Sequence, residues 1–227
     1  MRYFLSMALL AALASAVSAN DPRTLGVQNV GGAGGGAITA EIWADNWFAL
    51  HVNGTLVAQD SVPYETERSF NAERITFNAD LPMKVAVELR DYMENETGLE
   101  YIGTRRQQMG DGGAILQFLG EDGVLGVSSA AWRCHVAQSA PVDASCEGAR
   151  DPEIGLGACA AEVDMPATDW IAPGFDDSGW QAATEYSERA VRPKDGYDAI
   201  SWDSAARIIW SGDLERDNIV LCRATIG

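Results

Sequence analysis

Catalytic motifs are absent from this chain of 227 residues. It has no G-x-S-x-G nucleophile motif, no H-E-x-x-H metal motif and no phosphate-binding loop. Only two histidines are present, and no local pattern marks a serine that either could activate. Two carboxylates suffice for glycoside hydrolysis, but no pair stands out among 33 acidic residues. We therefore expect a binding protein and not an enzyme.

Positive charge is also scarce. The chain holds 16 Lys and Arg against 33 Asp and Glu, which gives a formal net charge of −17. An acidic surface repels phosphate backbones, so we expect no nucleic acid partner. Cations, cationic surfaces and neutral glycans remain open as ligands.

Long hydrophobic runs are limited to the first residues. Arg2 is followed by an apolar run, Leu5–Ala14, and by the small residues Val17–Ala19. This order predicts a secretory signal peptide over residues 1–19, and the run is too short for a lasting membrane span. No other segment is apolar enough to cross a bilayer. The sequence thus predicts a secreted or periplasmic protein, with the cell surface as a further location.

Cysteine is sparse but even in number, and no C-x-x-C pair indicates a zinc ribbon or a redox site. Four cysteines in an exported chain predict two disulfides, for which three pairings exist. We favour Cys146–Cys159, which closes a local loop, and Cys134–Cys222, which joins two expected strands.

Helical patterns are nearly missing, with residues 187–191 as the one candidate turn. Residues 20–37 are rich in glycine and are expected to form a flexible arm. Residues 38–227 are expected to form a single β-sandwich domain, in which the irregular loop 137–166 is stapled by a disulfide. Apolar alternation and turn residues predict the strands 38–44, 47–52, 55–58, 74–77, 83–90, 98–103, 114–118, 129–136, 207–210 and 218–226.

Two separate segments resemble parts of one known fold. They are Ile38–Gly54, ITAEIWADNWFALHVNG, and Trp170–Trp180, WIAPGFDDSGW. Both are similar to segments of the sugar-binding jelly-roll domains (galactose-binding-like fold) attached to secreted glycosidases. Those domains usually carry the FDDS segment first, so the order here looks circularly permuted. The resemblance spans about a third of the mature chain and implies an all-β, antiparallel jelly roll with an extracellular glycan or cell-surface component as partner.

The FDDS segment also has a purely structural interpretation. Asp176 and Ser178 fit an Asx-type turn in which a carboxylate accepts from a backbone amide while Phe175 and Trp180 are buried. The functional alternative is that Asp176 or Asp177 contacts a ligand or an ion.

A sugar site needs exposed aromatic faces together with planar polar groups. Strand alternation predicts that Trp43, Trp132 and Trp210 point inward and leaves Trp47, Trp202 and Tyr101 as the exposed candidates. Loop positions add the polar candidates Asp45, Asn46, Arg105, Arg106, Asp198 and Asp203. The expected ligand site comprises Trp47, Asp45, Asn46, Tyr101, Arg105 and Trp202.

No cofactor follows directly from the sequence, and calcium and copper are the two ions to consider. Acidic clusters suggest calcium at Asp91 and Glu94 or at Asp213 and Asp217, because calcium prefers hard oxygen ligands. Related jelly rolls often carry a structural calcium. The alternative is a solvated acidic turn.

Copper is the second metal hypothesis. His51 and His135 follow Trp47 and Trp132 in expected strands, and imidazole suits copper. The arrangement loosely resembles the secreted copper-binding proteins of methane-oxidising bacteria, in which a His and a modified Trp serve as ligands, although the spacing differs. The alternatives are structural histidines and, for the whole chain, a surface-assembly protein that uses its Gly-rich arm.

Overall fold

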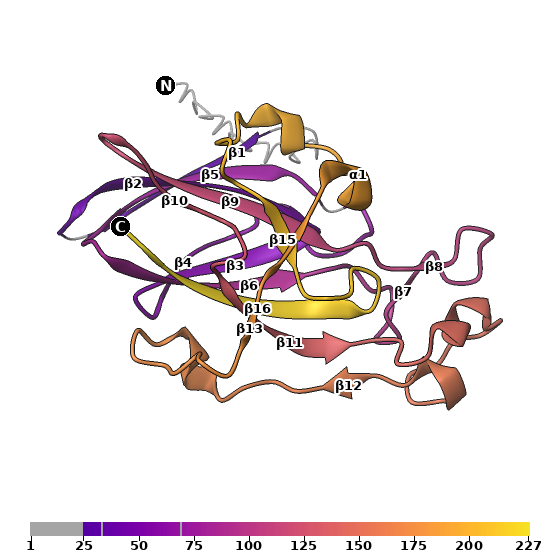
Figure 1. Ribbon diagram of the computed structural model, residues 1–227. Helices are drawn as coiled ribbons and strands as arrows, with labels where there is room; N and C mark the ends of the chain where they lie inside the picture. Colours follow the sequence, from indigo (N-terminus) through magenta and orange to yellow (C-terminus); the bar gives the residue numbers. More distant parts are fainter. Residues whose placement is uncertain (1–24, 33, 69) are drawn as a thin grey trace, which may run out of the picture.

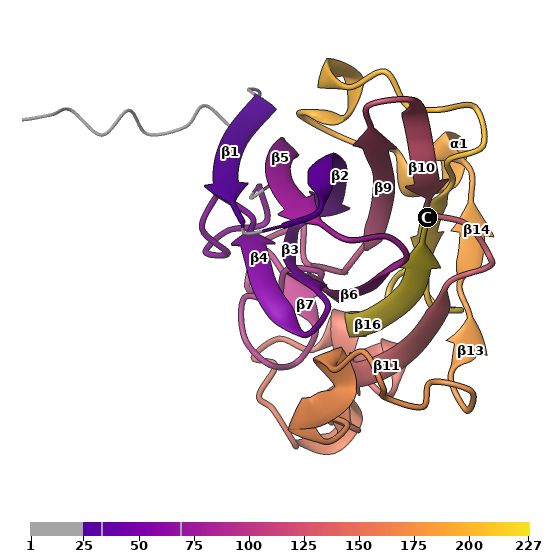
Figure 2. The same cartoon turned by 90° about the vertical axis from the view of Figure 1, so that its left-hand side faces the viewer.

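Alternating apolar residues give most strands one face that must leave water, and two sheets stack those faces against each other. The computed structural model describes residues 25–32, 34–68 and 70–227. Figures 1 and 2 show the two layers. The expected all-β sandwich is confirmed, whereas the signal peptide lies outside the described residues.

The first sheet has the strand order β1–β5–β2–β9–β15–β14, with β10 paired to β9 as well. Its pairings are antiparallel except for β1 with β5. Its strands are β1 (Leu25–Gly31), β2 (Gly36–Asp45), β5 (Ala72–Ala79), β9 (Gly113–Gly120), β10 (Gly123–Val127), β14 (Thr184–Tyr186) and β15 (Ile208–Trp210).

The second sheet is antiparallel throughout, with the order β12–β11–β16–β6–β3–β4 and β13 paired to β11. Its strands are β3 (Trp47–Val52), β4 (Thr55–Gln59), β6 (Met83–Arg90), β11 (Arg133–Ser139), β12 (Glu162–Val163), β13 (Gln181–Ala182) and β16 (Asp217–Ile226). The Asn53-Gly54 turn between β3 and β4 has positive φ at both residues, 50° and 83°, as the sequence predicts for a tight hairpin.

Short elements lie outside the two sheets. A two-stranded ribbon of β7 (Leu99–Glu100) and β8 (Gln108–Met109) extends from one end of the sandwich, at the right of Figure 1. Within the described residues there is one α-helical turn, α1 (Glu188–Val191), which confirms the helical candidate at residues 187–191. The 3₁₀ turns are η1 (Ala144–Gly148), η2 (Gly157–Cys159), η3 (Thr168–Ile171) and η4 (Tyr197–Ala199).

Part of the expected Gly-rich arm is a strand, which corrects the prediction for that segment. Strand β1 pairs in parallel with β5, and the Gln28 side chain donates to the Gln59 carbonyl and to Glu73. The open edge of β5 offers backbone groups that need partners, and Leu25–Val30 supplies them despite its low hydrophobicity. Glycine density alone therefore misjudged this stretch.

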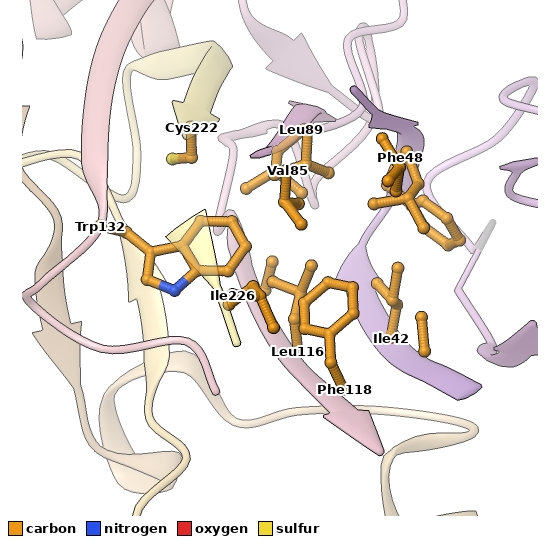
Figure 3. Close-up of a cluster of buried hydrophobic side chains, with 14 of the residues drawn as sticks. Ile42, Phe48, Val85, Leu89, Leu116, Phe118, Trp132, Cys222 and Ile226 are labelled. Carbon is orange, nitrogen blue, oxygen red and sulfur yellow. The ribbon is translucent and has the colours of Figure 1, made fainter. Parts of the chain in front are cut away.

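The space between the sheets is filled by large apolar side chains. Figure 3 shows Ile42, Leu116 and Phe118 of the first sheet facing Val85 and Leu89 of the second. The Phe118 and Trp132 rings stack with centroids 6.4 Å apart. The inward direction is confirmed for Trp132 and Trp210, which are at most 1 % exposed and belong to the core between the sheets. It is wrong for Trp43, which is fully buried but packs on the outer face of its sheet, edge-on to Tyr197.

Several expected strand boundaries shift. The segment 98–103 contains only β7 and then a turn, in which Tyr101 has a φ of 52°. Strand β11 begins at Arg133 and not at residue 129, because residues 128–132 form a turn closed by the Trp132 amide donating to the Ser129 carbonyl. Strand β10 is an additional hairpin partner of β9.

The FDDS segment covers the outer face of the second sheet and adopts the structural interpretation. The Ser178 amide donates to Asp176 Oδ1 at 3.0 Å, which is the expected Asx turn. Arg223, only 3 % exposed, donates to Asp177 Oδ2 and to the carbonyls of Trp170 and Ala172. This buried guanidinium therefore ties the segment to β16.

Both favoured disulfides are present, Cys134–Cys222 and Cys146–Cys159. The first joins directly opposed residues of β11 and β16 in the second sheet. The second joins η1 to η2 and staples the irregular loop within 137–166, as expected.

The two disulfides should stabilise the fold unequally. They close loops of 88 and 13 residues, and the chain-entropy contribution grows with loop length. We expect the double variant Cys134→Ala/Cys222→Ala to lose about 4–5 kcal/mol of unfolding free energy, and Cys146→Ala/Cys159→Ala about 3 kcal/mol. Urea denaturation measures both. A larger loss for the short loop would contradict the loop-entropy account.

Candidate functional site

Three strand ends from both sheets meet at the end of the sandwich that carries the β7–β8 ribbon. Asp45 is the last residue of β2 and lies opposite Gly113, the first residue of β9. Asp111 stands two residues before β9, and Asp91 directly follows β6. The Asp91 amide donates to the Asn218 carbonyl of β16 at 2.9 Å, which fixes its position. The topology thus places three aspartates side by side.

These aspartates form a tight cluster. Each offers a carboxylate oxygen, and the three oxygens lie within 4.8 Å of one another. Lys194, in the loop after α1, donates to Asp45 Oδ2 at 3.2 Å and to Asp111 Oδ2 at 2.8 Å. Its ammonium also lies 4.9 Å from the centre of the Phe70 ring. We call Asp45, Asp91, Asp111 and Lys194 the aspartate cluster.

Four buried oxygens of the cluster have no hydrogen-bond partner among the described residues. They are Asp45 Oδ1, Asp111 Oδ1 and both oxygens of Asp91. Gly110 lies so close to Asp91 that a Cβ at this position would overlap Asp91 Oδ2. Asn218, whose backbone carbonyl accepts from the Asp91 amide, has a fully buried side chain with both amide atoms likewise unpartnered. Unpartnered buried carboxylate oxygens are costly, so their accumulation here points to an interaction outside the chain.

Burial governs the protonation of the cluster. It raises the pKa of Asp45 to about 7 despite the opposing charge of Lys194. It also raises the pKa of Asp91 well above its ordinary value, with Asp45 and Glu100 adding repulsion. Burial lowers the pKa of Lys194, but Asp45 and Asp111 outweigh that effect and raise it. Like charges at this distance cannot all ionise without compensation.

The ionised cluster would carry two uncompensated negative charges, from three carboxylates and one ammonium. A divalent cation would neutralise this charge and supply a partner to oxygens that the chain leaves without one. Access is available through Asp111, whose side chain is 37 % exposed. The cluster is also the single place in residues 25–32, 34–68 and 70–227 where three acidic, histidine or cysteine ligand atoms come this close.

A polar pocket opens directly above the cluster. Asp111 and Lys194 line it together with Glu100 and Tyr101. Gln108 donates to Glu100 Oε2 at 3.0 Å, and burial raises the pKa of Glu100 to about 8. The pocket and the cluster therefore share one wall.

The residues expected to bind a ligand are divided by the structure. Asp45 belongs to the cluster, and Tyr101 lines the pocket. Asn46 positions the neighbouring loops, because its side chain donates to the Glu67 carbonyl and accepts from the Tyr92 amide. Arg105 is exposed and lies outside the pocket, whereas the adjacent Arg106 lines it.

The two tryptophans expected at the ligand site are half-buried and engaged with other side chains. The Arg90 guanidinium lies over the Trp47 ring, 5.4 Å from the ring centre, and Tyr64 lies beside Trp47. Trp202 donates to the Tyr197 carbonyl at 3.1 Å and lies by the Tyr197 ring. Neither lines the pocket above the cluster.

The expected calcium residues do not act together. Asp91 is in the aspartate cluster, but Glu94 instead accepts from the Ile102 amide at 2.7 Å. Asp213 pairs with Arg216 and accepts the Glu215 amide, and Asp217 accepts from Ser139 at 2.5 Å. Protein donors thus already occupy the second acidic loop.

The structure does not bring the two histidines to one ion. His51 on β3 and His135 on β11 are separated by β6 and β16 in the sheet, which corresponds to roughly 14 Å. His51 contacts the Trp170 ring, and His135 stacks on Trp180 at 5.3 Å. One copper ion cannot bridge imidazoles three strand spacings apart, because each nitrogen must lie about 2 Å from the metal.

Asp111 and Lys194 were missed by the sequence reasoning. The chain has only two lysines, and the other, Lys84, is exposed and donates to Thr225. The scarcity of lysine and the Gly-Asp-Gly-Gly segment around Asp111 are only weak signals of this contact. Nothing in the sequence links Lys194 to Asp111, which lies 83 positions earlier.

Comparisons with models of known protein families, with curated proteins and with solved structures found no match for this chain. None of the helices in the described part of the chain has the length and apolar character needed to span a membrane. The site must therefore be interpreted from its own chemistry.

Removing the Lys194 charge should make stability strongly dependent on pH. We expect Lys194→Met, in EDTA at pH 8, to lower the free energy of unfolding by about 1–3 kcal/mol. The loss should be smaller than for breaking a fully buried ion pair, because the Lys194 side chain is 36 % exposed. The raised pKa of Asp45 means that the folded protein holds a proton that the unfolded chain releases between about pH 4 and 7. Stability is therefore lost as pH rises through that window, and more steeply in the variant.

Urea unfolding at pH 5 and pH 8 tests this expectation. Lys84→Met, at the other lysine, is the matched control and should follow the wild-type pH dependence. Equal losses for Lys194→Met at both pH values would show that the ammonium does not compensate the buried carboxylates.

Proposed function

We propose that the protein is a non-catalytic binding protein that holds a divalent cation between Asp45, Asp91 and Asp111. The observation that carries the proposal is the set of four buried carboxylate oxygens with no partner in the described chain. Lys194 occupies the other oxygen of Asp45 and of Asp111, so the cation and the ammonium do not compete for the same atoms.

Calcium is the ion that this donor set suits best. All the oxygens come from carboxylates, and the Asn218 amide and solvent entering past Asp111 offer further oxygen donors nearby. Calcium accepts six to eight oxygens in variable geometry, whereas copper and zinc favour imidazole or thiolate. Asp91 thus remains a proposed calcium ligand, but with Asp45 and Asp111 as its partners in place of Glu94.

An extracellular location supports a calcium site. Two disulfides and an absence of free cysteines in the described residues suit an oxidising compartment. Calcium is abundant there, and sites outside the cell bind it with dissociation constants of about 10⁻⁴–10⁻³ M. Secretion remains part of the proposal.

The galactose-binding-like character of the sandwich is also proposed. It is supported by the two-sheet architecture and by the way both resembling segments join the second sheet, one through β3 and the other through Arg223. A glycan ligand, expected from that resemblance, is supported by the polar pocket that shares Asp111 and Lys194 with the cluster.

The decisive variant is Asp91→Asn. It replaces a fully buried carboxyl group, whose ionised form burial disfavours, by a neutral amide, so the metal-free variant should be at least as stable as the wild type in EDTA. Wild-type protein should gain about 2.7 kcal/mol when calcium is 100 times its Kd, and the variant should lose most of this gain. Thermal unfolding in EDTA and in calcium measures the two stabilities, and calorimetric titration measures the calcium affinity.

Asp80→Asn, which changes an exposed carboxylate after β5, is the control and should keep the wild-type calcium response. Absence of a response to calcium, magnesium and manganese in the wild type would refute the proposal. A full response in Asp91→Asn would place the ion at a different site.

A further inference from the structure

The pocket above the aspartate cluster has the size of a saccharide-binding site. Its volume is about 470 Å³, within the range of small-ligand sites. Its wall comes from three loops that are distant in sequence: Glu67, Arg68 and Phe70 lie in the first, residues between Glu100 and Asp111 in the second, and residues between Arg192 and Asp195 in the third. Nothing in the cation proposal assigns a ligand to this space.

Three arginines line the pocket, and none of them has a carboxylate partner among the described residues. They are Arg68, Arg106 and Arg192, and all three are exposed. Five other described arginines pair with carboxylates elsewhere in the fold, as Arg74 does with Glu41 and Arg223 with Asp177. Of the seven described arginines without such a partner, three line this pocket. In a chain with twice as many acidic as basic residues, unpaired arginines gathered in one pocket indicate an anionic group on the ligand.

The acidic groups of the same wall indicate hydroxyl donors on the ligand. Asp111 is held by Lys194, and Glu100 by Gln108. Glu67 and Asp195 line the pocket as further acceptors. A small inorganic anion has no use for these acceptors, whereas a sugar ring donates hydrogen bonds from several hydroxyls around one carboxylate.

The pocket is also conformationally fixed. Three non-glycine residues of the described chain have positive φ, and one of them, Asn53, is explained by its hairpin turn. The other two are Arg192, at 53°, which is the left-handed C-cap of α1, and Tyr101, at 52°, whose carbonyl accepts from the Thr104 amide in the turn after β7. Both residues line this pocket, so the helix end and the turn fix its wall. The Arg106 guanidinium lies 4.0 Å from the centre of the Tyr101 ring, which orients its planar face.

We infer that the pocket binds the uronate unit of an acidic glycan, with Arg106 and Arg192 receiving its carboxylate and Glu100 and Gln108 its hydroxyls. The inference deepens the proposed function, because it names the ligand class for the end of the sandwich that holds the cation. A planar carboxylate matches the two parallel N–H donors of a guanidinium. At physiological ionic strength the remote acidic surface is screened over about 8 Å, so local arginines determine recognition.

Calorimetric titration with trigalacturonate tests the inference, with maltotriose as the neutral probe and a sulfated trisaccharide as the second anionic probe. The titration is run in EDTA, since oligogalacturonates also bind calcium. We expect Arg106→Gln and Arg192→Gln each to weaken trigalacturonate binding at least tenfold, because a charged hydrogen bond is lost. Arg105→Gln, at the neighbouring exposed arginine outside the pocket, should bind as the wild type does.

Three results would overturn the inference: no trigalacturonate binding, equal affinity for maltotriose, or tighter binding of the sulfated probe. An equal loss in Arg105→Gln would also do so, because it would indicate a diffuse charge effect. Calcium titration of the same variants separates the two proposals. Calcium binding without trigalacturonate binding refutes only the pocket inference, and the reverse result refutes only the cation site.

Discussion

Charge compensation at one end of the sandwich is the constraint on which the proposed function of this molecule depends. Asp45, Asp91 and Asp111 come from ends of strands in both sheets, and folding brings their oxygens within 4.8 Å. Lys194 balances one charge of the three. The strands cannot separate to relieve the repulsion, because their neighbouring residues are fixed in the core between the sheets. The remaining charge must be met by protons or by a cation, and the choice couples the site to its surroundings.

The rest of the architecture holds this end in place. The Cys134–Cys222 bond joins β11 to β16, and Asn218 on β16 accepts the amide hydrogen bond of Asp91. Gly110 allows the β8–β9 loop to approach Asp91 without a side chain between them. On the outer face of the second sheet, Arg223 anchors the FDDS segment by three hydrogen-bonding contacts. That segment is therefore a cover for the sheet, and the proposed binding sites lie in the loops at the sandwich end.

The cluster and the pocket would contact different parts of the proposed ligand complex. The cluster buries its oxygens away from water and suits a small ion, whereas the pocket presents exposed arginines and hydrogen-bond acceptors to a larger polar molecule. Asp111 and Lys194 belong to both, so a cation below would change the field felt by an anionic group above. Such coupling would make affinity for the two ligands reciprocal.

The sequence by itself determined the fold class, the inward Trp132 and Trp210, the Asn53-Gly54 hairpin and the Asx turn at Asp176, and it favoured the disulfide pairing that the structure has. These features rest on local patterns, such as alternation with period two, turn chemistry and an even cysteine count. Strand β1 was missed because its pairing depends on the free edge of β5 and not on its own composition. The aspartate cluster was decided only by tertiary structure. Asp45, Asp111 and Lys194 are up to 149 positions apart, and only the order of strands in two stacked sheets brings their charges together.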